Sequence, residues 1–182
     1  MISILIVEDD PVKLKSIKSA ILELPDFAQK DIKVAIDKNT AREFLMEEQF
    51  DLVILDVTLS ERFGDELEED GGIKLLEEMN VADDFNLPFH IIGITAYPDR
   101  KEKFMKRFSD LLWHLIVYNE QYNEWKFQLI NYIRYLVKSQ TELRNPIAHL
   151  LTHSLLAYPA AEGDPAYPVN IKMVKLPNVN LA

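Results

Sequence analysis

Acidic residues and one threonine stand directly after three apolar stretches of the sequence. The set consists of Glu8, Asp9, Asp10, Asp56 and Thr95. Carboxylates that crowd together repel one another, and a hard divalent cation such as Mg²⁺, which prefers oxygen ligands, relieves that repulsion. We therefore expect a carboxylate-lined Mg²⁺ site if the fold brings these residues together. An ion that keeps some of its water ligands can also receive a phosphoryl group, which a carboxylate oxygen of Asp56 would attack in line.

Five short apolar stretches are rich in β-branched residues and do not alternate strictly, which is typical of strands that are covered on both faces. They span residues 2–7, 32–36, 52–55, 89–95 and 115–118. Segments with helical spacing follow them, after Pro11, after Asn39 or Thr40, and over residues 73–79, 101–108 and 124–137. This alternation predicts an α/β fold with a doubly wound, five-stranded parallel sheet and helices on both faces. Ligands of such sheets bind beyond the carboxyl ends of the strands, where the acidic residues stand.

Composition and charge narrow the class of protein. The 182 residues are 48% hydrophobic and 27% charged, as in ordinary globular proteins, and the formal net charge of -10 opposes binding to nucleic acid. The absence of cysteine excludes disulfides, thiol nucleophiles and cysteine-ligated metals. No apolar run approaches the ~20 residues that span a bilayer, and the first residues do not resemble a signal peptide. We therefore expect a cytoplasmic protein that binds neither membranes nor nucleic acid.

Prolines become frequent after residue 140, which indicates a change of structure. We assign residues 1–140 to the main domain and residues 141–182 to a C-terminal extension. The extension is too short for a core of its own, so we expect it to pack on the domain, on a second copy or on a partner. Within it we expect a helix over 146–156 and a strand over 169–176. His149 and His153 have helical spacing, but a third ligand is missing, so we expect no zinc site.

Three motifs together resemble the receiver domain of two-component response regulators. They read ILIVEDD at 4–10, DLVILDVTL at 51–59 and GITA at 93–96, and the resemblance covers residues 1–140. It implies a flavodoxin-like fold with strand order 2-1-3-4-5 and a role in phosphorelay signal transduction. It also implies that a histidine kinase, a phosphotransfer protein or a small donor such as acetyl phosphate supplies the phosphoryl group, and that output passes through contacts with a downstream protein or a homodimer.

The same resemblance assigns a role to each residue of the expected site. It implies that Asp56 is the phosphoacceptor and that the Thr95 hydroxyl binds the phosphoryl oxygens. It further implies that Glu8, Asp9, Asp56 and the backbone carbonyl of Thr58 hold Mg²⁺, with Asp10 as a neighbour of this set. Such a protein accepts a phosphoryl group and is not a turnover enzyme.

Two departures from the family pattern favour a second hypothesis. Receivers normally carry a lysine after the fifth strand, whose ammonium pairs with the acceptor, but Tyr118 stands there and Lys126 lies about two helical turns beyond. The aromatic residue that usually moves inward on activation is replaced by Leu115. The second hypothesis is therefore a phosphorylation-independent pseudo-receiver that acts as a dimerisation or protein-interaction module.

An acidic insertion, residues 60–70, lies between the third strand and the third helix. We expect it to add negative charge near the phosphoryl pocket and to be able to act as a lid. A third hypothesis, a phosphatase that works through an aspartyl phosphate, requires an Asp-x-Asp motif after the first strand. The sequence Asp56-Val57-Thr58 contains only one acid, which argues against such a phosphatase.

Overall fold

A computed structural model of the chain describes residues 2–98, 104–107 and 114–144. The chain divides into two compact units, Met1–Thr141 and Glu142–Ala182, and the fold and the site lie in the first. The predicted helix over 101–108 is described only at 104–107, which are helical. The helix and the strand expected in the C-terminal extension, with His149 and His153, lie outside the described residues. The assignment of a separate extension from residue 141 therefore stays a prediction.

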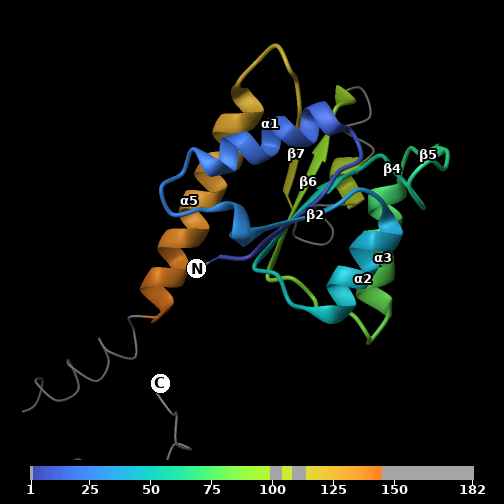
Figure 1. The fold of residues 1–182 in the computed structure, drawn as a ribbon, viewed down its shortest axis with the longest axis horizontal. Helices are drawn as coiled ribbons and strands as arrows, with labels where there is room; N and C mark the ends of the chain where they lie inside the picture. The colour runs from blue at the N-terminus through green and yellow to red at the C-terminus, as the bar shows by residue number, and fades with distance from the viewer. Residues whose placement is uncertain (1, 99–103, 108–113, 145–182) are drawn as a thin grey trace, which may run out of the picture. The chain divides into compact units, whose positions relative to one another are not determined.

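The main sheet is parallel and has five strands (Figure 1). These are β1 (Ile4–Val7), β2 (Ile32–Ala35), β3 (Leu52–Asp56), β6 (His90–Thr95) and β7 (His114–Val117). Their order across the sheet is β2-β1-β3-β6-β7, which is 2-1-3-4-5 when the five strands are counted along the chain. The predicted doubly wound sheet is therefore confirmed. The register pairs Val7 with Leu55 and Asp56 with Ile94, so the carboxyl ends of the three central strands lie at one edge.

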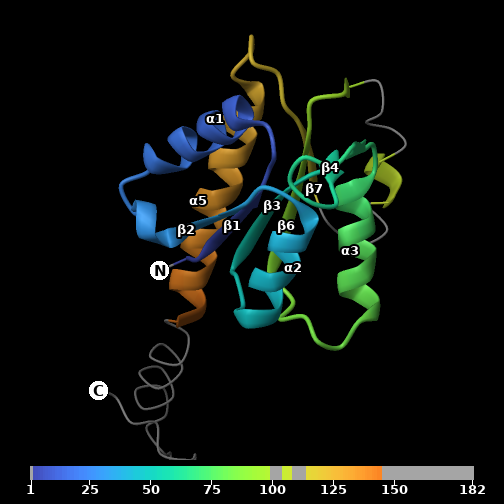
Figure 2. The same ribbon diagram turned by 45° about the vertical axis from the view of Figure 1, so that its right-hand side comes forward.

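Helices cover both faces of the sheet (Figure 2). One face carries α1 (Pro11–Leu22) and α5 (Glu124–Arg144), and the other carries α2 (Lys38–Glu47) and α3 (Gly71–Val81). A 3-10 turn, Gln29–Asp31, leads into β2. Each face has its own core because neighbouring residues of a strand point to opposite sides. Ile4 and Ile6 of β1 pack toward α1 and α5, whereas Leu5 and Val7 pack toward α2 and α3. Two-sided burial explains why the strands lack a polar face in the sequence.

No helix in the described part of the chain is both long enough and apolar enough to cross a bilayer.

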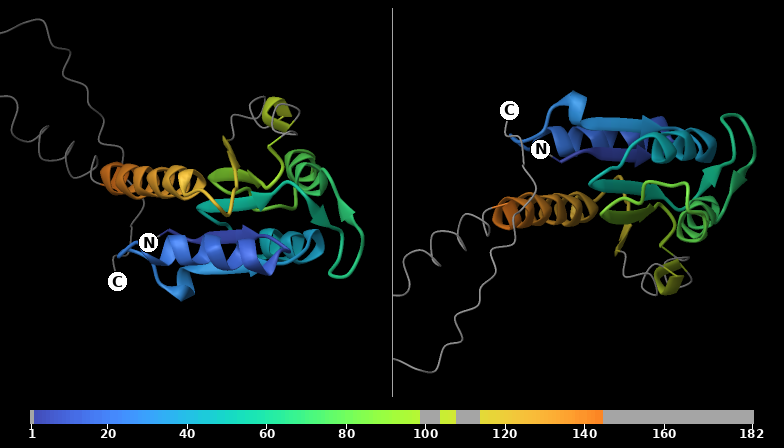
Figure 3. Two further views of the ribbon diagram at one scale, coloured as in Figure 1. Left: turned by 90° about the horizontal axis from the view of Figure 1, so that it is seen from above. Right: turned by 90° about the horizontal axis from the view of Figure 1, so that it is seen from below.

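The insertion after β3 contains an antiparallel hairpin of two short strands, β4 (Leu59–Ser60) and β5 (Leu67–Glu68). It lies beside α3, at the edge of the fold that Figure 3 shows from above and from below. Two-residue strands are too short to leave an alternating pattern, so the sequence does not predict them. Leu59 is fully buried, which anchors the first strand of the hairpin in the core beneath α2 and α3.

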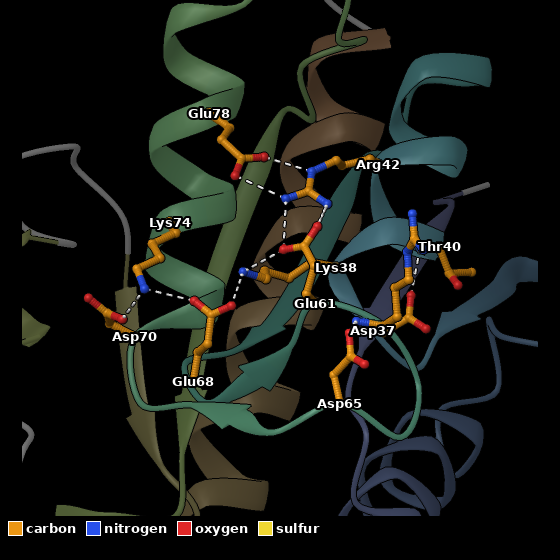
Figure 4. Close-up of polar contacts among 11 residues, drawn as sticks. Asp37, Lys38, Thr40, Arg42, Glu61, Asp65, Glu68, Asp70, Lys74 and Glu78 are labelled. Carbon is orange, nitrogen blue, oxygen red and sulfur yellow. Dashed lines mark hydrogen bonds and ion pairs between the residues drawn. The ribbon is translucent and has the colours of Figure 1, made fainter.

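Ion pairs fasten the insertion to α2 and α3 (Figure 4). Lys38 Nζ lies 2.8 Å from carboxylate oxygens of both Glu61 and Glu68, although its own side chain is only 3% exposed. Arg42 joins Glu61 to Glu78 of α3, and Lys74 Nζ lies 2.7 Å from Glu68. The insertion therefore carries less unbalanced negative charge than its composition indicates, and these contacts tie it to the helices.

Candidate functional site

Three carboxylates meet at the carboxyl edge of the sheet. Glu8 and Asp9 directly follow β1, and Asp56 is the last residue of the neighbouring strand β3. One oxygen from each of the three lies within 4.8 Å of the other two. Glu8 is fully buried, Asp56 is 6% exposed and Asp9 is half-buried. The structure thus brings together the three side chains that the sequence predicts to converge.

Asp10 does not belong to the carboxylate cluster and instead caps a helix. Its carboxylate accepts hydrogen bonds from the backbone N–H groups of Val12, at 2.7 Å, and Lys13, at 3.2 Å, and so caps the N-terminus of α1. Pro11 favours the same start because its fixed φ suits the first helical position. The backbone N–H of Asp10 donates to Glu8 Oε1 at 3.1 Å. The cap thereby fixes both the direction of α1 and the orientation of the Glu8 carboxylate.

A lysine from the first turn of α1 completes the cluster. Lys13 Nζ lies 2.8 Å from Glu8 Oε2 and 2.8 Å from Asp56 Oδ1, and the Lys13 residue is 3% exposed. Both contacts are charge-assisted ion pairs between the ammonium and a carboxylate oxygen. The Tyr118 ring, which follows β7, lies under the ammonium at 5.9 Å from Nζ to the ring centroid.

The sequence contains a signal for Lys13 that our sequence analysis missed. Lys13, Ile17, Ala20 and Ile21 form the buried face of α1, so the lysine occupies an apolar position of the helical pattern. Lysine is almost never fully buried unless it is paired, and such a position therefore indicates a buried anionic partner. Lys126, the downstream lysine that we considered, pairs instead with Glu23 at 2.7 Å on the surface.

Burial and mutual repulsion shift the titration of the carboxylates. Burial, with the charge of Asp56 second, raises the pKa of Glu8 to about 8. The same two causes raise the pKa of Asp9, and burial raises that of Asp56 although Lys13 opposes it. Burial acts to lower the pKa of Lys13, but the charges of Asp56 and Glu8 outweigh it and raise that pKa. One ammonium therefore compensates three carboxylates only in part.

The donor set fits a hard divalent cation. All three donors are carboxylate oxygens, and ligands that share one Mg²⁺ lie no more than about 4.2 Å apart because each Mg–O distance is about 2.1 Å. Oxygens within 4.8 Å of one another need only a small closure to meet that limit. A cation would also favour the ionised form of Glu8, whose pKa burial and Asp56 raise. Glu8, Asp9 and Asp56 are thus the residues that would hold the ion.

The two threonines of the expected site lie at the same edge. Thr95 ends β6, beside β3, and is fully buried. Its Oγ1 accepts from the backbone N–H of Tyr97 at 3.2 Å, which leaves the hydroxyl proton for another acceptor. Thr58 is buried two residues after Asp56, and its backbone N–H lowers the pKa of Asp56, an effect smaller than that of burial or Lys13. The roles of the Thr95 hydroxyl and the Thr58 carbonyl stay predictions.

Gly72, at the start of α3, packs directly against the backbone of Asp56. The Gly72 N–H donates to the Val57 carbonyl at 3.0 Å. A Cβ at position 72 would lie 1.8 Å from the backbone oxygen of Asp56, so only glycine permits this approach. The neighbouring Gly71 lies similarly close to Leu59, the residue that precedes the insertion. Two glycines thus set the position of the acceptor and of the insertion against α3.

Comparisons with known proteins find one curated relative. No protein-family model matches the chain. The uncharacterized protein y4jS of Sinorhizobium fredii is 32% identical over 133 residues, which cover 73% of this chain and 32% of that protein. The chain therefore spans about a third of the length of the curated relative that it matches.

Solved structures with the same fold include receiver domains and response regulators. The response regulator protein TrrA of Thermotoga maritima, crystallised in complex with Mg²⁺ and BeF, is 22% identical with a TM-score of 0.51 over 75% of this chain and 99% of that one. The receiver domain of the sensor histidine kinase PA1611 from Pseudomonas aeruginosa, with magnesium in its active site cleft, is 16% identical with a TM-score of 0.53 over 75% and 98%. The first 144 residues of this chain, where the structure describes them, therefore have the fold of response-regulator receiver domains.

Proposed function

We propose that the chain is a receiver of phosphorelay signalling that accepts a phosphoryl group on Asp56 while Glu8, Asp9 and Asp56 hold Mg²⁺. The observation that carries this proposal is the meeting of three carboxylates from two strands at the carboxyl edge of the sheet, within 4.8 Å of one another. The receiver fold and the metal-containing structures of the two similar proteins support it.

The reaction follows from the geometry of the acceptor. A carboxylate oxygen of Asp56 attacks phosphorus, an acyl phosphate bond forms, and the bond from phosphorus to the donor breaks. The donor atom, an imidazole nitrogen of a phosphohistidine or an oxygen of acetyl phosphate, leaves with the bonding electron pair. Bound Mg²⁺ would neutralise charge on the phosphoryl oxygens. Burial of Asp56 keeps bulk water from the site, and the free proton of the Thr95 hydroxyl is available to a phosphoryl oxygen.

The proposal extends to the partners of the chain. A histidine kinase or a phosphotransfer protein would donate the phosphoryl group, and a downstream protein or a second copy of the chain would receive the signal. The protein would work in the cytoplasm, as expected from its sequence.

A specific observation favours the alternative of a phosphorylation-independent interaction module. Tyr118 occupies the position after β7 where the resemblance leads us to expect a lysine, and its ring packs against Trp125 with centroids 4.9 Å apart. Both residues are buried in the core under α1 and α5. Tyr118 is neutral, so the residue at this position supplies no positive charge to the acceptor.

Phosphorylation by a small donor separates the two functions. The full chain is incubated with acetyl phosphate and Mg²⁺, and its intact mass is measured beside those of Asp56→Asn and the exposed control Asp84→Asn. We expect wild type and the control to gain one phosphoryl group and Asp56→Asn to gain none. A gain that persists in Asp56→Asn would show that another residue is the acceptor.

A wild-type protein that gains no phosphoryl group and also binds no beryllofluoride, an analogue of the phosphoryl group, would favour the interaction module.

A further inference from the structure

We propose that Lys13 is the cationic ligand of the phosphoryl group, so that the first helix supplies the positive charge that contacts the acceptor. This inference rests on the proposed phosphorylation of Asp56 and deepens it. Among the cationic side chains that the structure describes, Lys13 is the one that an ion pair places on Asp56. The other paired cations, including Lys38, Lys74 and Lys126, pair with acids elsewhere.

Burial and spare hydrogen-bonding capacity point to a ligand at the Lys13 ammonium. Its side chain is only 3% exposed, and Nζ lies 2.8 Å from one oxygen of Glu8 and 2.8 Å from one oxygen of Asp56. An ammonium has three N–H donors, and within the part of the chain that the structure describes two carboxylate oxygens pair with it, which leaves one donor for a further oxygen. Phosphoryl oxygens on Asp56 would lie two bonds from the carboxylate oxygen that attacked phosphorus, close to Nζ. The lysine is therefore placed to exchange an ion pair with the carboxylate for charge-assisted hydrogen bonds to the phosphoryl group.

The surroundings hold Lys13 in this position from two sides. The N-cap of Asp10 fixes the first turn of α1, where Lys13 is the third helical residue. The Tyr118 ring lies below the ammonium, and Trp125 supports that ring in turn. A cation is attracted to the face of an aromatic ring, and more strongly when water is excluded. Tyr118, the residue after β7, thus contacts and stabilises the ammonium of Lys13, which comes from α1.

The positive charge of Lys13 should affect Mg²⁺ and the phosphoryl group in opposite directions. Three carboxylates and one ammonium leave a formal charge of -2, which one divalent cation balances. Lys13 repels that cation and occupies oxygens of Glu8 and Asp56, so removing its charge favours Mg²⁺. The same removal takes a positive charge from an anionic phosphoryl group and so disfavours it.

The test measures both affinities on the full chain. Mg²⁺ binding is titrated first, and beryllofluoride is then titrated at saturating Mg²⁺, for wild type and for Lys13→Met. The control is Lys15→Met, which removes the same side chain from the exposed face of the same helix. We expect Lys13→Met to bind Mg²⁺ about tenfold more tightly and beryllofluoride at least about tenfold more weakly. We expect Lys15→Met to match wild type for both.

Equal affinities in Lys13→Met and wild type would overturn the inference, and so would a parallel loss of both affinities, which a merely structural lysine would produce. If Lys13→Met does not fold, the double variant Lys13→Met/Tyr118→Lys restores the charge of the pocket. We expect it to regain beryllofluoride binding to within about tenfold of wild type, and no binding by the folded double variant would count against the inference. A wild type that binds no beryllofluoride but whose Mg²⁺ affinity responds to Lys13→Met would instead refute phosphorylation.

Discussion

Replacing Gly72 by alanine tests how the backbone of Asp56 is held. The new Cβ would lie 1.8 Å from the Asp56 carbonyl oxygen, whereas real Cβ contacts are no shorter than 3.0 Å, so the two backbones must separate. Overpacking of this kind costs about 1–3 kcal/mol. Loss of the hydrogen bond from Gly72 to the Val57 carbonyl costs about 1 kcal/mol more, while the higher helix propensity of alanine returns at most about 1 kcal/mol. We expect the free energy of unfolding to fall by about 2 kcal/mol.

The same displacement should weaken the candidate metal site. Moving the Asp56 backbone moves one of three ligand carboxylates, so we expect weaker Mg²⁺ binding in Gly72→Ala. The assay combines urea unfolding, followed by circular dichroism, with a Mg²⁺ titration of the folded protein. Gly71→Ala is the matched control, because its Cβ would meet the backbone oxygen of Leu59 at 2.3 Å and not Asp56. We expect it to lose stability and to keep its Mg²⁺ affinity. Wild-type stability and wild-type Mg²⁺ affinity in Gly72→Ala would refute this reasoning.

Three further predictions concern the ion pairs and the metal ligands. Arg42 and then Lys38 lower the pKa of Glu61 from 4.5 to about 2, so its contribution to stability is complete above about pH 4.5 and is lost as the pH falls toward about 2. Urea midpoints at about pH 6 and about pH 3 should therefore differ less in Arg42→Met than in wild type, and an unchanged difference would contradict this cause. Lys38→Met should lower the free energy of unfolding by only about 1–2 kcal/mol, because the Glu61 and Glu68 carboxylates that it leaves unpaired are exposed enough to be hydrated. We expect its Mg²⁺ affinity to equal that of wild type, and a loss of Mg²⁺ binding would show that the insertion influences the site. Asp9→Asn should lower Mg²⁺ affinity by at least about tenfold, because it removes one of the three carboxylate ligands. The urea midpoint should stay nearly unchanged, because Asp9 is half-buried. A Mg²⁺ titration equal to that of wild type would exclude Asp9 from the ligand set.

The sheet could be predicted because its strands are covered on both faces. The stretch at 52–55 contains only apolar residues, and it forms the fully buried core of β3. The end of the last helix was less well predicted. The expected helix stops at residue 137 because the residues that follow are polar. The helix α5 nevertheless continues to Arg144, because the sequence contains no helix breaker before Pro146. Apolar periodicity cannot define the end of a helix whose final turns have lost their apolar face.

The carboxylates of the site could be predicted because parallel strands end at one edge of a sheet. Glu8 and Asp56 each stand at the carboxyl end of such a strand, so their meeting follows from the strand order. Lys13 could not be found by that reasoning, since it lies in a helix and approaches the edge from above one face. Its detection required the helical pattern of α1, in which a lysine takes an apolar position beside Ile17.

A crystal structure of the full chain grown with Mg²⁺ and beryllofluoride tests the central claim most directly. We predict one metal ion between the oxygens of Glu8, Asp9 and Asp56, with beryllofluoride on Asp56 and its fluorine atoms facing Lys13 Nζ. Carboxylates that remain paired with Lys13 alone at saturating Mg²⁺, or a metal ion bound elsewhere, would contradict it.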